Sequence, residues 1–245
     1  MKEIQIRKND AGQRLDRFVG KAVPLLPESL LQKYIRLKRI KRNGKGTKRD
    51  VRLVEGDVLQ LYINDEFFER PTEENAWLKI ATPRLDIVYE DENILLADKK
   101  PGVLCHSAGE WSWDTLISNI QAYLRQSGEW DPKAENAFTP ALCNRIDRNT
   151  GGIVIAAKNA EALRILNDKI RDREIDKAYL CVVCGRPKPA EGRLEGYLFK
   201  DAVKNQVYVT KKPQPGAKSA ATEYRTLQSS RGLSLVECRL LTGRT

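Results

Sequence analysis

Apolar residues recur at helical spacing in two stretches near the start of the chain. Residues 13–23, QRLDRFVGKAV, predict a short helix that ends at Pro24. Residues 27–40, PESLLQKYIRLKRI, predict a second helix, because a Pro and an early Glu suit a helix N-terminus. The apolar faces of the two helices comprise Leu15, Phe18, Val19 and Val23, and Leu30, Leu31, Tyr34, Ile35 and Leu37.

Short apolar runs and turn signals follow these helices. The dipeptide Asn43-Gly44 predicts a turn, and residues 51–63, VRLVEGDVLQLYI, predict a small hairpin with EGD between its strands. Residues 85–99, LDIVYEDENILLADK, predict a strand, a tight turn and a second strand. The first 60 residues therefore form a compact unit whose size allows it to fold alone, though with little stability to spare.

Helices and strands mix irregularly in the rest of the chain. A helix is predicted over residues 112–126 with Ser112 as N-cap, and another over residues 160–172 with Asn159 as N-cap. Further strands are predicted at 152–158, 177–185, 206–210, 221–228 and 234–241. Because there is no regular alternation of strand and helix, we expect an α+β fold with a mixed, largely antiparallel sheet and flanking helices.

Charge divides the chain into two dissimilar parts. Residues 1–60 hold 16 Lys or Arg and 7 Asp or Glu, so they carry +9 of the net charge of +10. This asymmetry indicates a basic module with a polyanionic partner, although a basic surface that serves only solubility is the alternative. The acidic, proline-containing stretch after it reads as a linker. The predicted boundaries are 1–63 for the module, 64–83 for the linker and 84–245 for the body.

Several classes of protein are disfavoured by what the sequence lacks. No apolar run has the length of a membrane span, and the first residues do not resemble a signal peptide. The five cysteines read as reduced thiols of a cytosolic protein, and we expect the pair Cys181 and Cys184 to pack in a strand. The single histidine, His106, would have to carry any triad or histidine metal site alone.

The segment NRIDRNTGG, residues 144–152, concentrates charge between two apolar runs. Strands on both sides would hold Asp147 on a rigid loop, where partial burial raises its pKa and a neighbouring Arg lowers it again. An ionised Asp of this kind suits a nucleophile or a general base. An Asp–Arg pair that only fixes the loop is the alternative, and spacing alone favours it.

Four segments in order resemble the RluA-type pseudouridine synthase family. NRIDRNTGG resembles its HRLDxxTSG signature, with Asn144 where His is usual and Gly151 where Ser is usual. YEDENILLADKKPGVLCH is similar to its opening hairpin and lysine-proline-glycine loop, KAYLCVVCG to its lysine-x-tyrosine strand, and LLTGRT to the start of its last motif. The basic module resembles the S-four-like RNA-binding domain that often precedes this catalytic domain.

The resemblance implies an RNA uridine isomerase that needs neither cofactor nor metal. Asp147 would be the essential carboxylate, Tyr179 would lie against the flipped uracil, and Arg244 would pair with Asp147. Arg148 would help to hold the displaced nucleotide, and Arg145 would support the site. The module is expected to contact RNA through Arg14, Arg36, Lys38, Arg39, Lys41 and Arg42.

The resemblance leaves the substrate and one rival function open. Large-subunit ribosomal RNA is the expected target, with tRNA as the alternative, and the protein is expected to be cytoplasmic and monomeric. Because the chain stops at Thr245, inside the last family motif, we expect a shortened catalytic domain with residues from about 240 onward poorly fixed. The rival is a non-catalytic RNA-binding protein derived from a truncated synthase.

Overall fold

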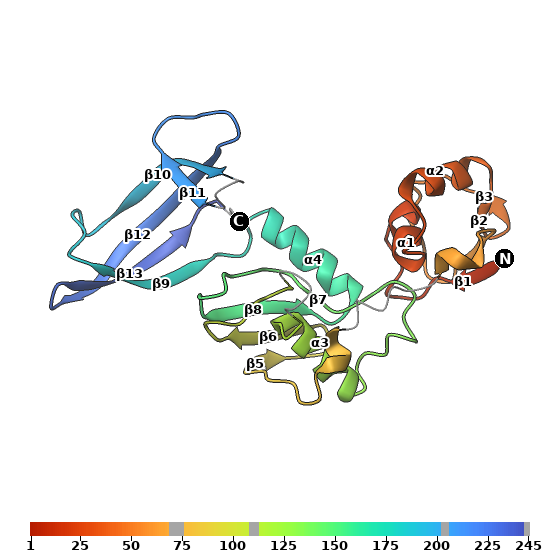
Figure 1. The fold of residues 1–245 in the computed structure, drawn as a ribbon, viewed down its shortest axis with the longest axis horizontal. Helices are drawn as coiled ribbons and strands as arrows, with labels where there is room; N and C mark the ends of the chain where they lie inside the picture. The colour runs from red at the N-terminus through yellow and green to blue at the C-terminus, as the bar shows by residue number, and fades with distance from the viewer. Residues whose placement is uncertain (69–75, 108–112, 202–205, 243–245) are drawn as a thin grey trace. The chain divides into compact units, whose positions relative to one another are not determined.

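The structure is a computed structural model that describes residues 1–68, 76–107, 113–201 and 206–242. The chain forms two compact units, Met1–Asp168 and Lys169–Thr245 (Figure 1). All strand pairs among the described residues are antiparallel, which confirms the predicted mixture of helices with largely antiparallel sheet. No helix in these ranges is long and apolar enough to span a bilayer.

The first part of unit 1 is a small sheet with two helices over a dry core. The sheet has the strand order β1-β4-β2-β3, and its core holds the buried residues of both helices. The elements are β1 (Lys2–Gln5), α1 (Leu15–Ala22), α2 (Glu28–Arg36), β2 (Ile40–Arg42), β3 (Lys45–Gly46) and β4 (Val58–Leu61).

The apolar faces predicted for α1 and α2 are buried, with one exception. Leu37 is 59% exposed, so its placement on the apolar face is wrong. The helix ends at Arg36, before Leu37, and Lys38 takes a left-handed backbone with φ of 55° that no helix can continue. The predicted Asn-Gly turn joins β2 to β3, with positive φ at both Asn43 and Gly44.

The hairpin predicted over residues 51–63 is wrong. Its second run forms β4, but its first run supplies only an isolated bridge between Arg52 and Arg14. β4 pairs instead with β1 and β2. The competing partner is β1, a strand at the start of the chain that local patterns did not predict. Two neighbours across the sheet satisfy more of the main chain of β4 than one local hairpin partner would.

The body of unit 1 is a four-stranded sheet with the order β5-β6-β8-β7, packed against α3. Its buried cluster includes Leu95, Ile120 and Val154 from β6, α3 and β8. The elements are β5 (Ile87–Glu90), β6 (Ile94–Lys99), α3 (Leu116–Gln126), β7 (Ala141–Leu142), β8 (Gly152–Ala157) and α4 (Ala160–Arg171), with short 3-10 turns η1 (Asp65–Phe68) and η3 (Ala76–Lys79) before them.

The helices of the body begin at side-chain caps. Thr115 caps α3 and forms a reciprocal capping box with Ser118. The predicted cap, Ser112, lies outside the described residues. Asn159 caps α4 as predicted, because its side-chain oxygen accepts a hydrogen bond of 2.8 Å from the Ala162 amide.

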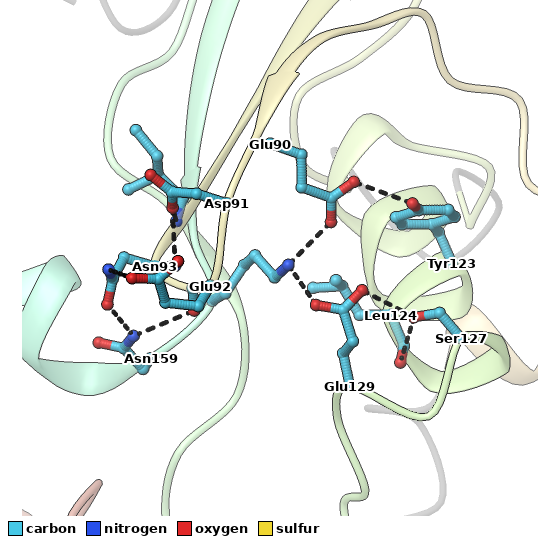
Figure 2. A network of polar contacts seen from close by, with 11 residues as sticks. Glu90, Asp91, Glu92, Asn93, Tyr123, Leu124, Ser127, Glu129 and Asn159 are labelled. Carbon is cyan, nitrogen blue, oxygen red and sulfur yellow. Dashed lines mark hydrogen bonds and ion pairs between the residues drawn. The ribbon is translucent and has the colours of Figure 1, made fainter.

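A buried polar network joins β5, the end of β8 and the turn after α3 (Figure 2). The Lys158 ammonium lies 2.8 Å from Glu90 and also pairs with Glu129, while the Tyr123 hydroxyl donates to Glu90 at 2.9 Å. Burial lowers the pKa of Lys158, but its two carboxylate partners outweigh burial and leave that pKa raised. The network therefore fixes one end of β8, the strand whose other end begins at the NRIDRNTGG segment.

Hydrogen bonds also connect the first residues of unit 1 to its body. Asn136 donates to the Asp10 carboxylate at 2.7 Å, and Asn9 donates to the Glu135 carboxylate at 2.8 Å. Asp10 is completely buried, so its contacts are shielded from water. These contacts place the two sheets of unit 1 in one compact body.

Unit 2 contains a five-stranded sheet with the order β11-β10-β12-β13-β9. Four of its strands were predicted, and β10 was missed because Gly and Glu interrupt its apolar pattern. Residues 240 to 242 are hydrogen-bonded to Lys177 and Ala221, so their predicted looseness is wrong. The elements are β9 (Ala178–Cys184), β10 (Glu191–Asp201), β11 (Gln206–Thr210), β12 (Lys218–Ser230) and β13 (Leu233–Leu240).

The expected core packing of Cys181 and Cys184 is wrong, because both side chains are exposed. The described residues 178–201 and 206–242 form strands and turns only, so no helix of this segment covers either face of the sheet. Apolar neighbours in β9 are open for the same reason, with Leu180 66% and Val182 65% exposed. Cys181 lies 3.8 Å from the sulfur of Cys238 on the adjacent strand.

Candidate active site

The NRIDRNTGG segment forms a loop between β7 and β8 whose start is tied to β8. The Cys143 amide donates to the Ile155 carbonyl at 2.8 Å. Asn144 continues this pairing with its side chain, because its oxygen accepts from the Ile155 amide at 2.8 Å and its nitrogen donates to the Ile153 carbonyl at 3.3 Å. An amide side chain supplies both a donor and an acceptor at this position, so the loop is fixed where the family signature usually has His.

A second loop, which follows β6, runs beside the first. The Gly102 amide donates to the Arg148 carbonyl at 2.8 Å, and the Arg148 Nε donates to the Gly102 carbonyl at 3.1 Å. Farther along, the Cys105 thiol contacts the Ile146 carbonyl at 3.4 Å. The two loops therefore run antiparallel, and the contacts between them lie at the residues before and after Asp147.

Lys99, the last residue of β6, donates hydrogen bonds from its side chain to both loops. Its side chain is 1% exposed, and its ammonium donates to the carbonyls of Lys100, Val103 and Arg148 at 3.2, 2.8 and 3.0 Å. Burial lowers the pKa of Lys99, while the nearby carboxylate of Asp147 opposes that change. A buried cation thus stabilises the loop that carries the candidate carboxylate.

Two adjacent glycines let the backbone pass close to the second loop. A side chain at Gly151 would place its Cβ 3.2 Å from the Cδ of Pro101, which is closer than such contacts normally are. Gly152 has φ of 134°, a conformation that other residues rarely adopt. Glycine therefore suits both positions, one for the close packing on Pro101 and the other for its backbone conformation.

Asp147 itself is exposed, so the partial burial expected for its carboxylate is wrong. Its carboxylate has no hydrogen bond or ion pair with another described residue. The alternative in which an Asp–Arg pair fixes the loop is therefore also wrong, because Arg145 and Arg148 are exposed and Lys99 makes the fixing contacts. The carboxylate is free to meet a substrate.

The remaining residues predicted for the site belong to unit 2. Tyr179 is half-buried in β9, where it lies opposite Cys238 of β13. Arg244 lies outside the described residues. The roles predicted for these two residues stay predictions.

The six basic residues predicted to contact RNA fall into three structural pairs. Arg14 and Arg42 are held in ion pairs, at 2.6 Å from Asp16 and 2.7 Å from Asp57. The Arg39 and Lys41 cations lie over aromatic rings, at 4.8 Å from the centre of Tyr34 and 5.2 Å from that of Tyr62. Arg36 and Lys38 line an open hollow of about 560 Å³.

We call this hollow the basic hollow, and its lining includes two further cations that were not predicted to contact RNA. Lys48 and Arg49 complete it, together with Arg36 and Lys38. Lys48 and Arg49 follow β3. The charge pattern of this stretch predicts that the module is basic, but it does not predict which cations lie together. Asn43-Gly44 predicts the β2–β3 turn, but no local pattern reveals that the residues after it converge with the end of α2.

His106, for which the sequence predicts no role, lies beside the candidate carboxylate loop. Its side chain is exposed, and it follows Cys105, whose thiol contacts Ile146. Partial loss of hydration and the positive charge of Arg145 lower the pKa of His106. Among the described residues, no three His, Cys, Asp or Glu side chains cluster as a metal site would require.

Among the described residues, Asp147 thus presents an exposed carboxylate without a partner, on a fixed loop beside exposed arginines, an arrangement that suits an anionic substrate. The family model for RNA pseudouridylate synthase matches residues 93–245, more than half of the chain, and this span contains both loops of the site. The chain belongs to the RNA pseudouridylate synthase family, and is thus an isomerase.

Similar proteins extend along nearly the whole sequence. An uncharacterized RNA pseudouridine synthase of Mycoplasma genitalium is 32% identical over 244 residues, which cover 98% of this chain and 74% of that protein. The ribosomal large subunit pseudouridine synthase C of Escherichia coli K12 is 26% identical over 246 residues, covering 100% of this chain and 73% of that protein. The chain spans about three quarters of the length of these relatives.

Among solved structures, the human RNA pseudouridylate synthase domain containing 4 shares the fold. It superposes with a TM-score of 0.53 at 21% identity, over 70% of this chain and 64% of that one. This likeness supports the fold assignment of the α+β body independently of the sequence motifs.

Proposed function

We propose that this chain converts uridine to pseudouridine in large-subunit ribosomal RNA, with Asp147 as the catalytic carboxylate. The observation that carries the proposal is the exposed carboxylate of Asp147, without a partner among the described residues, on a loop that buried Lys99 fixes. The reaction breaks the bond between the uracil nitrogen and the sugar, turns the base, and rejoins it through carbon 5. The uridine must leave its stack for this bond to become accessible.

The choice of substrate rests on the named relatives. The Escherichia coli and Vibrio parahaemolyticus proteins that resemble the chain along its length carry the name ribosomal large subunit pseudouridine synthase C. We infer the same class of RNA for this chain, with tRNA as the alternative, and a cytoplasmic monomer as the acting form.

The remaining site residues receive roles that follow from the family resemblance and from their chemistry. Arg148 holds the displaced nucleotide and Arg145 supports the site, because both guanidinium groups are exposed beside Asp147. In unit 2, Tyr179 supports the flipped uracil and Arg244 pairs with Asp147. No step of the reaction uses a metal or a cofactor.

Residues 1–63 serve as an S-four-like RNA-binding domain in this proposal, with residues 64–83 as linker and 84–245 as catalytic domain. The separate buried core of the first part supports this division. Arg36 and Lys38 in the basic hollow are the cations that RNA phosphates reach most directly, since Arg14 and Arg42 already have carboxylate partners.

Asp147→Asn tests the proposal directly. The variant keeps the size of the side chain and removes its charge, so pseudouridine formation in an unmodified large-subunit RNA transcript should be lost while RNA affinity stays within a few-fold. Asp65→Asn, at another exposed aspartate, is the matched control and should keep full activity.

The same experiment separates the proposal from its rival. Wild-type chain that binds the transcript but forms no pseudouridine would favour a non-catalytic RNA-binding protein. Pseudouridine formed by Asp147→Asn at the wild-type rate would instead remove Asp147 from the catalytic role while leaving the chain an isomerase.

A further inference from the structure

His106 is the single histidine of the chain, and the proposed reaction gives it no task. It lies on the loop after β6, and its ring makes no hydrogen bond with another described residue. The side chain is open to solvent, beside the loop that carries Asp147.

The pairing of the two loops determines what His106 faces. Gly102 is bonded to Arg148, and three residues later Cys105 contacts Ile146, so the loops run antiparallel. His106 directly follows Cys105 and Arg145 directly precedes Ile146, so both residues adjoin the contact between the loops. The effect of the Arg145 charge on the imidazole agrees with this placement.

Two groups of this kind make a binding site for an anion. A guanidinium offers a planar fork of donors that fits phosphate oxygens, and an imidazolium adds a further charged donor. The charged groups of the two loops are Lys99 and Lys100 on one side and Arg145, Asp147 and Arg148 on the other. Of these, Arg145 is the one whose charge lowers the pKa of His106 in the free protein.

We propose that His106 and Arg145 together bind a phosphate of the RNA backbone next to the reacting uridine, and that the imidazole takes up a proton from solvent as the RNA binds. This inference rests on the proposed action on RNA and adds a contact that determines where the strand lies. Arg145 disfavours the imidazolium while the site is empty, and the negative charge of a phosphodiester between them offsets that repulsion.

A proton taken up on binding makes RNA affinity depend on pH. By linkage, the affinity of the protein for RNA increases as pH falls through the pKa of His106 in the complex. Each unit by which RNA raises this pKa corresponds to about a tenfold gain in affinity at low pH. At high pH the contribution disappears, because the neutral ring no longer carries charge.

The geometry can be tested without RNA. Because the chain has one histidine, its imidazole signals in an NMR titration need no assignment. Arg145→Gln should raise the pKa of His106 measured in the free protein. An unchanged value would show that the two side chains do not face each other, and the inference would fall whatever the enzyme does.

The binding step is tested with an unmodified large-subunit RNA transcript at several values between about pH 5 and 8. Wild-type affinity should rise several-fold on acidification beyond the rise shown by His106→Gln, whose side chain cannot titrate. His106→Gln should also lower the salt dependence of binding at low pH, since a protein with one cation fewer at the phosphates releases fewer counterions.

The double variant His106→Gln with Arg145→Gln completes the cycle. If both residues bind one phosphate, the double variant should lose less RNA affinity than the sum of the losses in the two single variants. Identical pH profiles of wild type and His106→Gln, or strictly additive losses, would overturn the proposal. Failure of the wild type to form pseudouridine would contradict the proposed function and not this inference, since the experiments on His106 and Arg145 measure only binding and titration.

Discussion

At the residue scale, the site depends on a few side chains that replace main-chain contacts. Asn144 mimics a continuing strand by pairing with Ile153 and Ile155, and the Lys99 ammonium donates to three carbonyls of the two loops. Sequence could single out Asp147 as a candidate, because charge crowded between apolar runs is conspicuous and the segment resembles a family signature. It could not identify Lys99, because burial of a lysine depends on a loop that approaches from 49 positions away.

Lys99→Met should weaken both the fold and the loop. The variant fills similar space but leaves the Val103 carbonyl without its donor and removes the ammonium from the carbonyls of Lys100 and Arg148, a loss of about 1–3 kcal/mol in the free energy of unfolding. Because Gly102 is bonded to Arg148, the Gly102 amide should exchange its hydrogen faster in the variant, and activity per folded molecule should fall.

Lys100→Met is the matched control, because Lys100 is exposed and pairs with Asp86 and Asp98 on the surface. It should change the free energy of unfolding by less than about 1 kcal/mol. Equal effects on unfolding and on amide exchange in the two variants would contradict the role given to Lys99.

At the scale of elements, the position of the site follows from β8. Its start carries the glycines that permit close packing on Pro101, and its end is fixed by the Lys158 network (Figure 2). Helices α1, α2, α3 and α4 and most strands could be predicted from local patterns. The pairing of β1 with β4 and the open faces of the unit 2 sheet could not, because they depend on partners distant in sequence.

Lys158→Met should destabilise the body, because it leaves the carboxylates of Glu90 and Glu129 without their cation. Lys158 is nearly buried, while Glu129 is 40% exposed, so we expect a loss of up to about 3 kcal/mol, the lower end for breaking a buried pair. Urea unfolding at neutral pH measures the change.

Lys169→Met is a suitable comparison, since its ion pair with Glu174 is exposed at both side chains. That variant should unfold within about 1 kcal/mol of wild type. A Lys158→Met protein as stable as Lys169→Met would show that the network contributes nothing to holding β8.

At the scale of the whole molecule, the proposed function gives the charge of the first 60 residues and the chemistry of the Asp147 loop one polyanionic substrate. The basic hollow gathers Arg36, Lys38, Lys48 and Arg49 without carboxylate partners among its lining residues. Composition could predict the basic module, because the excess of charge is large. It could not distinguish cations held in ion pairs from cations open to solvent, because that depends on where Asp16 and Asp57 lie in the fold.

Replacing the four cations of the basic hollow by Ala should weaken RNA binding and flatten its salt dependence. Removing one cation from a phosphate lowers the slope of log affinity against log salt by about one. Arg14→Ala with Arg42→Ala is the control, and it should affect stability more than the salt slope. Equal slopes for wild type and the four-fold variant would show a basic surface that serves only solubility.

The central claim is tested most directly by mapping pseudouridines in total RNA from cells that carry the gene, cells that lack it, and cells that carry only the Asp147→Asn form. The account predicts at least one uridine of large-subunit ribosomal RNA that is modified in the first cells and unmodified in the other two. Identical pseudouridine maps in all three would contradict it.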